Sequence, residues 1–196
     1  MIVPDRCVPL LREQRTSYRD IPNEYADEMR RTYDSFAHVL PERAERILDI
    51  GCGMAGIDVH LSDHYGHNVE IVLADKEGVS PTILSGFAKS GDWFSHYHDF
   101  AAALELLGVN GVPLANVRTV DLLQESMPDE PVDVAISLLS WGFHYPIADY
   151  RPNVRPGGVI IADVRRHTDG LAELAKRGRV EIVHQETKYQ RAVCQC

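Results

Sequence analysis

A glycine-rich turn with a carboxylate before it is the segment of the sequence best suited to binding a ligand. Residues 51–56 read Gly-Cys-Gly-Met-Ala-Gly, match G-x-G-x-x-G and follow the apolar run 47–50. Glycines in such a turn let a ligand lie against bare backbone. Asp49 lies inside the end of the apolar run, and a buried carboxylate needs a donor or a cation as its partner. The pattern predicts a ligand that carries a positively charged amino group.

Two further acids follow later apolar runs. Asp75 comes directly after the run 69–74, about 20 residues beyond the turn, where a carboxylate can accept both hydroxyls of a ribose. Asp121 follows the run 117–120 and could accept a hydrogen bond from an adenine amino group. Taken literally, the glycines and Asp75 also match a dinucleotide fingerprint, so a nicotinamide cofactor remains an alternative to a ligand with an amino group.

Apolar runs alternate with helical patterns along the chain. We expect strands at 47–50, 69–74, 117–120, 132–137, 159–162, 180–185 and 189–194, and helices at 22–40, 57–65, 100–107 and 168–177. The first 20 residues look irregular. Near-continuous apolar strands are typical of a parallel sheet that is buried on both faces, and only the last two strands are joined closely enough to be antiparallel. The expected fold is α/β, with a doubly wound, Rossmann-like sheet and its ligand crevice at the carboxyl ends of the strands.

The composition limits the class of protein. The chain has 196 residues, 44% of them hydrophobic, and a net charge of −9. This favours one domain, 1–196, with a helical cap at 1–40 and a core at 41–196. The acidic balance argues against nucleic-acid partners and anionic membranes. No apolar run reaches the length of a membrane span, no signal peptide is visible, and the cysteines have no paired spacing, so we expect a cytoplasmic protein.

The motifs together resemble the class I S-adenosylmethionine-dependent methyltransferases. The segment 47–53 looks like their first motif, 73–75 like the second and 120–122 like the third, while Arg-Pro-Gly-Gly at 155–158 is similar to their entry to the fifth strand. One departure is Ala55, which stands where the first motif usually has its third glycine. The resemblance covers about residues 25–196 and implies a mostly parallel seven-stranded sheet with its last strand antiparallel.

The resemblance also implies the cofactor and the residues that bind it. S-adenosylmethionine would lie on the turn, with Asp75 on its ribose and Asp121 near its adenine. Cys52 would contribute its backbone alone. The expected cofactor-binding residues are Asp49, Gly51, Cys52, Gly53, Asp75, Lys76, Asp121, Leu122 and Leu138.

The segment after the run 132–137 is where the acceptor should meet the methyl group. It lacks the Asn/Asp-Pro-Pro-aromatic pattern of amino-methylating DNA enzymes, and no acid ends the run as in metal-dependent catechol-type enzymes. His144 is the candidate general base, because an imidazole can take a proton from a hydroxyl near neutral pH. Tyr145 is a second candidate catalytic residue, although it could equally belong to the core. The predicted reaction is methyl transfer to a small-molecule acceptor, with oxygen as the favoured atom.

Several alternatives stay open. The chain could be a small NAD-binding oxidoreductase or a module that binds S-adenosylmethionine without turnover. Residues 93–98 are expected to begin a helix, with a lid over the crevice as the alternative. We expect no metal, because His96 and His98 have no third ligand identifiable by spacing. Arg165 and Arg166 could bind an acidic acceptor or simply be solvated, and the sequence predicts no oligomeric state.

Overall fold

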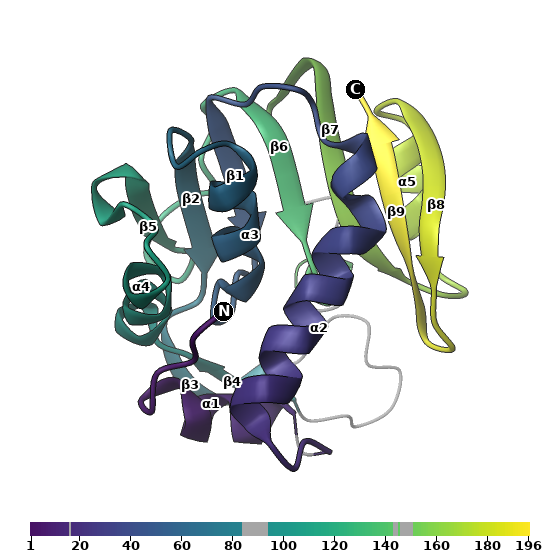
Figure 1. Ribbon diagram of the computed structural model, residues 1–196. Helices are drawn as coiled ribbons and strands as arrows, with labels where there is room; N and C mark the ends of the chain where they lie inside the picture. Colours follow the sequence, from purple (N-terminus) through teal and green to yellow (C-terminus); the bar gives the residue numbers. More distant parts are fainter. Residues whose placement is uncertain (16, 84–93, 143–144, 146–150) are drawn as a thin grey trace.

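The computed structural model describes residues 1–15, 17–83, 94–142, 145 and 151–196. Its largest element is a seven-stranded sheet with the order β5-β2-β1-β6-β7-β9-β8 (Figure 1). In chain order these strands are β1 (Arg46–Ile50), β2 (Glu70–Asp75), β5 (Val117–Asp121), β6 (Val132–Ser137), β7 (Val154–Arg165), β8 (Arg179–Gln185) and β9 (Tyr189–Gln195). Strands β5, β2, β1, β6 and β7 pair in parallel, whereas β9 is antiparallel to both β7 and β8. This confirms the expected doubly wound architecture with a reversed last strand.

The two faces of the sheet explain why its strands read as continuous apolar runs. Successive side chains of a strand point to opposite faces. Ile47 and Ile71 are buried in the core on one face, while Leu48 and Val72 are buried in the core on the other. Because both faces are covered, neither alternate set of residues can be polar without a partner.

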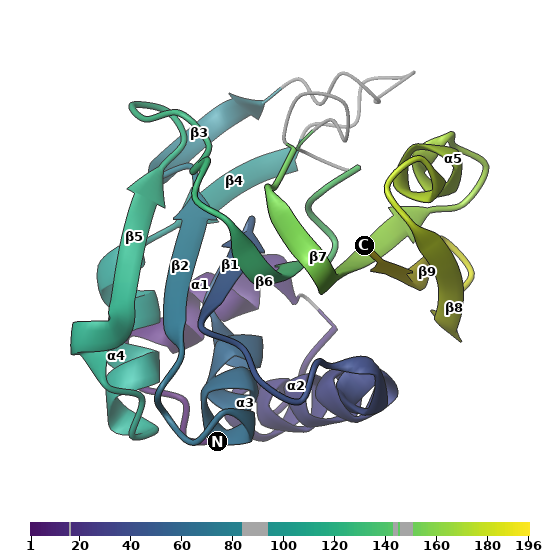
Figure 2. The same ribbon diagram turned by 90° about the horizontal axis from the view of Figure 1, so that it is seen from above.

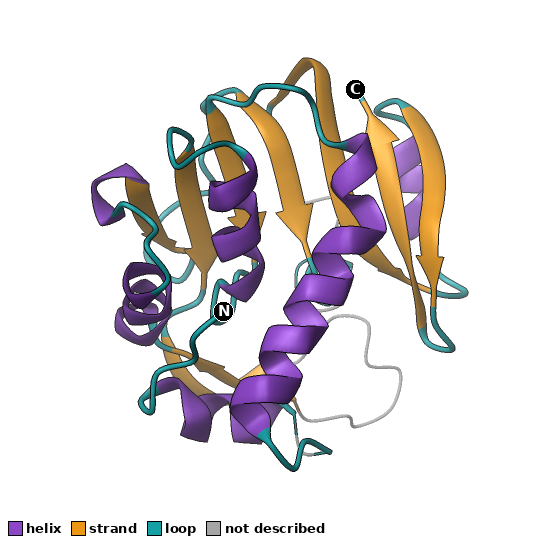
Figure 3. Cartoon of the chain, in the orientation of Figure 1, coloured by secondary structure: helices purple, strands orange, loops and turns teal. Residues whose placement is uncertain are grey.

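Helices cover both faces of the sheet, as Figures 2 and 3 show. On one face lie α1 (Cys7–Gln14), α2 (Ile21–Phe36), α3 (Gly56–His64) and α4 (Phe100–Val109), and on the other lies α5 (Gly170–Ala175). Short 3-10 turns at Ala37–Val39 and Leu114–Asn116 complete the described helical elements. The helix predicted at 22–40 is therefore α2 plus the first of these turns. Asp20 caps α2 by accepting a hydrogen bond from the Asn23 backbone N–H at 3.5 Å.

The structure corrects three sequence-based expectations. The first 20 residues are not wholly irregular, since α1 buries Cys7 and Leu11 against the helical core. Residues 94–98 do not begin a helix: β4 (Phe94–His98) pairs antiparallel with β3 (Gly78–Ile83), and α4 starts after its cap Asp99. Helix α5 is also shorter than the predicted 168–177, because only Gly170–Ala175 is helical.

The carboxyl ends of the parallel strands meet at one edge, toward the bottom of Figure 1. The register pairs Ile50 with Ala74 and Asp75 with Asp121, so residues that end three strands lie level with one another. Helix α1, the start of α2 and the hairpin β3–β4 lie at this same edge, and α1 contacts β4. Within the described part of the chain, no helix combines the length and the apolar character needed to cross a membrane.

Candidate functional site

The glycine-rich turn presents backbone amides at the carboxyl end of β1. Gly51 and Gly53 have φ values of +70° and +53°, which side-chain-bearing residues rarely adopt. The Gly51 N–H donates to the Ala74 carbonyl at 2.7 Å, and the Gly53 N–H donates to Asp75 Oδ2 at 2.9 Å. A Cβ on Gly53 would meet nothing within 4 Å, whereas a Cβ on Gly51 would lie 2.3 Å from the Cβ of Ser140. The turn is therefore open at Gly53 and closed by protein at Gly51.

The end of the turn serves packing rather than ligand contact. A Cβ on Gly56 would lie 2.5 Å from the Tyr25 hydroxyl, so this glycine lets α2 approach α3 closely. Ala55 has a left-handed φ of 55°, a conformation that costs an alanine about 1–2 kcal/mol. A glycine would avoid this strain, which explains why the first motif of the methyltransferases usually has a glycine at this position.

Asp75 is the centre of the hydrogen-bond network at this edge. It is 3% exposed. Besides the Gly53 N–H, its carboxylate accepts hydrogen bonds from the Tyr145 hydroxyl at 2.6 Å and the Lys76 N–H at 2.8 Å, both on Oδ1. His98 Nδ1 lies 3.8 Å from Oδ2. The carboxylate is thus held in place next to the open side of the turn.

A pair of buried carboxyl groups lies beside the turn, formed by Asp49 of β1 and Asp58 in the first turn of α3. They are 2% and 0% exposed and lie within hydrogen-bond reach of each other. Beyond Asp49, neither oxygen of Asp58 has a hydrogen-bond partner among the described residues. Burial is the main cause that raises the pKa of Asp58 to about 7, and burial together with Asp58 and Asp75 raises the pKa of Asp49 well above its usual value. The pair is a place where a cation would be stabilised.

Two neighbours complete the surroundings of Asp75. Cys52 is 9% exposed, and burial followed by the charges of Asp75, Asp49 and Asp58 raises the pKa of its thiol. The Lys76 ammonium lies 4.8 Å from the centroid of the Tyr145 ring, and burial lowers its pKa. This edge of the sheet therefore has several acidic groups close to one lysine.

The remaining predicted cofactor residues lie on the next strands. Asp121 accepts hydrogen bonds from the Glu77 and Leu123 N–H groups at 3.1 and 3.0 Å. The Leu122 N–H donates to the Asp75 carbonyl at 2.8 Å. Leu138 is partly buried against the helical core. The structure thus brings the ends of β1, β2 and β5 together.

The predicted acceptor segment is described only in part. Ser137 donates to the Ile50 carbonyl at 2.6 Å and accepts from the Trp141 N–H at 2.8 Å, so it ties the end of β6 to β1. Tyr145 is 2% exposed, and burial, followed by the charge of Asp75, raises its pKa, which keeps the phenol protonated. His144 lies outside the described residues.

The structure describes Arg165 and Arg166 in full but the segment 93–98 only in part. Arg166 is exposed, and its side chain donates to the Glu186 carbonyl at 3.4 Å, while its N–H donates to the Lys188 carbonyl. Arg165 precedes it at the end of β7 and is partly buried. A lid was the alternative for residues 93–98, of which Trp93 lies outside the described residues and 94–98 form β4.

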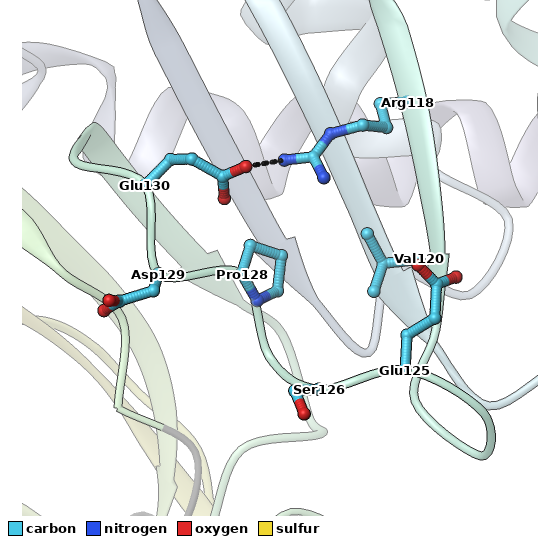
Figure 4. A pocket seen from close by; sticks show the side chains of 7 residues that line it. All are labelled: Arg118, Val120, Glu125, Ser126, Pro128, Asp129 and Glu130. Atoms are coloured by element: carbon cyan, nitrogen blue, oxygen red, sulfur yellow. Dashed lines mark ion pairs between the residues drawn. The ribbon is translucent and has the colours of Figure 1, made fainter.

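Two surface hollows lie away from this crevice. One, of about 430 Å³, adjoins β5 and the loop that follows it (Figure 4). Its lining residues are Arg118, Val120, Glu125, Ser126, Pro128, Asp129 and Glu130. Arg118 and Glu130 form an ion pair across it at 3.3 Å. The other, of about 670 Å³, lies near Asp133 and Arg155. Neither hollow contains a predicted cofactor or catalytic residue, whereas the side chains of Ser140 and Tyr145 fill the space beside the turn.

Sequence reasoning missed three charged groups that matter for this region. Asp58 interrupts the apolar face of α3, and that interruption was the available signal. Asp163 of β7 and Arg191 of β9 likewise interrupt apolar strands, and they form a buried two-point ion pair at 2.9 and 3.0 Å. Arg191 also donates to Ser35 Oγ at 3.0 Å, which joins the sheet to α2.

Solved structures with this architecture include several methyltransferases. A precorrin-6y C5,15-methyltransferase from Geobacter metallireducens superposes with a TM-score of 0.52 at 16% identity, over 83% of this chain and 87% of that chain. A putative O-methyltransferase from Nostoc punctiforme gives 0.57 at 12% identity, over 98% of this chain and 61% of that chain. The mitomycin 7-O-methyltransferase MmcR gives 0.55 at 12% identity, over 95% and 60%.

The chain has the fold of a class I methyltransferase. It spans about 60% of the length of the two O-methyltransferases and most of the precorrin enzyme. No protein-family model matches the sequence, and no curated protein matches it. In this methyltransferase fold, the turn at 51–56, Asp49, Asp75 and Asp121 lie at the carboxyl edge of the sheet, where ligands of doubly wound folds bind.

Proposed function

We propose that this chain is an S-adenosylmethionine-dependent methyltransferase that acts on a small molecule, with oxygen as the acceptor atom. The observation that carries the proposal is the buried pair Asp49–Asp58 beside the glycine-rich turn. Two carboxyl groups that lack a cation among the described residues favour a cofactor with a positively charged amino acid part.

The same pair argues against the alternative of a nicotinamide cofactor. A dinucleotide places its anionic pyrophosphate on the glycine-rich turn and the start of the following helix. Here Asp49 precedes that turn, and Asp58 lies buried in the first turn of the helix. A pyrophosphate there would oppose ionisation of both carboxyl groups, because like charges cost free energy in a buried site, and would leave the pair without a cation.

The residues present fit the parts of S-adenosylmethionine. Asp49 and Asp58 offer acceptors to its ammonium group, Asp75 to its ribose hydroxyls and Asp121 to its adenine amino group. Bound S-adenosylmethionine supplies a methyl group already activated on a sulfonium, so the protein mainly has to align the acceptor and accept one proton. The open side of the turn at Gly53 leaves backbone accessible to such a ligand.

His144 is the residue that we propose as the proton acceptor. It belongs to the segment after β6, and its unperturbed pKa near 6.5 suits removal of a proton from a hydroxyl. Tyr145 stays in the proposal as a site residue, because its phenol donates to the Asp75 carboxylate that the ribose would take. The O-methyltransferases with similar folds support oxygen as the acceptor atom.

Ligand binding to the purified full chain tests the cofactor. We expect S-adenosylmethionine and S-adenosylhomocysteine to raise the melting temperature and NAD to leave it unchanged, because a ligand that binds only the native state stabilises it. Asp49→Asn should reduce the rise in melting temperature that these two ligands cause. Asp63→Asn is the matched control, since Asp63 is an exposed acid of α3. A melting temperature raised by NAD but not by S-adenosylmethionine would refute the proposal.

Turnover separates an enzyme from a binding module. Hydroxylated metabolites are incubated with the chain and S-adenosylmethionine, and S-adenosylhomocysteine is measured. Formation that depends on an acceptor is the expected result. Binding of S-adenosylmethionine with no turnover across a broad acceptor panel would favour the non-catalytic alternative.

A further inference from the structure

Three side chains of types that can bind a metal lie close together at the glycine-rich turn. They are Cys52 of the turn, Asp75 at the end of β2 and His98 at the end of β4. One donor atom from each lies within 4.8 Å of the other two, and all three residues are buried. They come from three separate segments, so no spacing within a motif could reveal them, and the sequence predicted no metal.

The distances need little adjustment to surround an ion. A tetrahedral zinc site with bonds of 2.0–2.3 Å separates its ligand atoms by roughly 3.3–3.8 Å. Asp75 Oδ2 and His98 Nδ1 are already 3.8 Å apart. The Cys52 Sγ therefore needs to approach the other two donor atoms by about 1.3 Å at most.

The second nitrogen of His98 faces an acid, as it does in many metal sites. Nε2 lies 3.9 Å from Glu77 Oε2. A ligating histidine commonly turns its other ring nitrogen toward a carboxylate, which fixes the orientation of the ring. This places Nδ1, beside Asp75, as the ligand atom. The ring also packs edge-on against Phe100, with centroids 4.2 Å apart.

We infer that Cys52, Asp75 and His98 form a binding site for a thiophilic divalent ion of the zinc class, and that this ion and the methyl donor exclude each other. A thiolate, an imidazole and a carboxylate suit such ions, whereas Mg²⁺ and Ca²⁺ prefer oxygen ligands alone. The buried carboxyl groups of Asp49 and Asp58 lie nearby, and a dication would favour their ionised forms. Mutual exclusion rests on the proposed function, because Asp75 is also the proposed ribose acceptor.

The thiolate is the form of cysteine that binds metal, so an ion that binds at Cys52 displaces the proton of its thiol into solvent.

Cadmium alone is the first probe, applied to the reduced, metal-stripped full chain. A cadmium–thiolate bond gives an ultraviolet charge-transfer band, which we expect to saturate at one ion per chain. Cys52→Ser should abolish the band, and His98→Gln should weaken Zn²⁺ binding at least tenfold in competition with a chelating dye. Circular dichroism and melting curves check that both variants fold.

Cys196→Ser is the matched control. Cys196 lies near Cys194 at the end of the chain, so these two thiols are the competing site. A band that survives Cys52→Ser but disappears in Cys196→Ser would overturn the inference, and so would the absence of a band in the unsubstituted chain.

The second measurement is S-adenosylhomocysteine affinity with and without saturating Zn²⁺. We expect the apparent affinity to fall at least tenfold with zinc, and His98→Gln to remove this fall while keeping the affinity measured without zinc. An affinity unchanged by bound zinc would refute the shared site. A Cys52-dependent band in a chain that binds no S-adenosylhomocysteine would instead refute the proposed function and leave the metal site standing.

Discussion

Replacing Asp58 by asparagine should make the protein more stable above neutral pH. Asp58 is fully buried, and its pKa rises from 3.8 to about 7. Between these values the folded protein holds a proton that the unfolded chain has already lost. The free energy of unfolding therefore falls as the pH rises through this range. An asparagine keeps the shape and the contact with Asp49 but has no proton to lose.

The expected change in the free energy of unfolding follows from the rise in the pKa of Asp58. A change of roughly three pKa units at about 1.4 kcal/mol each corresponds to a destabilisation on the order of 4 kcal/mol between pH 4 and pH 8. Because the group is fully buried, solvent screening does not reduce this value. Asp58→Asn should match the unsubstituted protein at pH 5 and exceed its stability at pH 8 by an amount approaching that figure.

Urea unfolding at pH 5, 6, 7 and 8, at constant ionic strength, measures the difference. The m-value should stay constant, so that midpoints report stability. Asp63→Asn, on the exposed side of the same helix, should follow the unsubstituted protein at every pH. Parallel pH profiles for the unsubstituted protein and Asp58→Asn would refute the account of the buried pair.

Four further outcomes are expected. Arg191→Met should cost about 3–5 kcal/mol in urea unfolding, because it leaves Asp163 buried without its cation and its two hydrogen bonds; a loss below 1 kcal/mol would contradict this. Asp75→Asn should weaken S-adenosylhomocysteine binding more than tenfold by calorimetry, since hydrogen bonds to a charged group contribute about 1.5–3 kcal/mol each; unchanged affinity in a folded variant would remove it from the site. His144→Ala should keep the cofactor, lose roughly 10²–10⁴-fold in kcat and flatten the acid limb of its pH profile; an unchanged profile would exclude the general base. Tyr145→Phe should tighten S-adenosylhomocysteine binding, because the phenol occupies Asp75; weaker binding in calorimetry would show that the phenol supports the site.

The parts of the fold that local patterns dictate could be predicted from the sequence. Strands buried on both faces must be continuously apolar, and the turn at 51–56 needs glycines for its positive φ angles. Both signals are local, and they located β1, β2, β5 and β6, together with Asp49, Asp75 and Asp121 near the ends of the first three. The parallel pairing of Asp75 with Asp121 then follows from the topology.

The remainder depends on contacts that no local pattern records. The strand β4 is polar and aromatic, so no apolar alternation revealed it, and its pairing with β3 spans the segment 84–93. Helix α1 has only eight residues and contains Pro9, so its local pattern is weak, and its packing against α2 and α4 stabilises it. The partnership of Asp49 with Asp58 is visible only when α3 is folded back onto β1.

The hydrogen bond from Tyr145 to Asp75 has a consequence for the order in which substrates bind. A donor that takes Asp75 for its ribose must displace the phenol, so donor binding and the position of Tyr145 form one equilibrium. The acceptor is expected to meet Tyr145 in its final position only once the donor is bound. Steady-state kinetics should then follow a compulsory order, with S-adenosylhomocysteine competing against the donor and inhibiting noncompetitively against the acceptor.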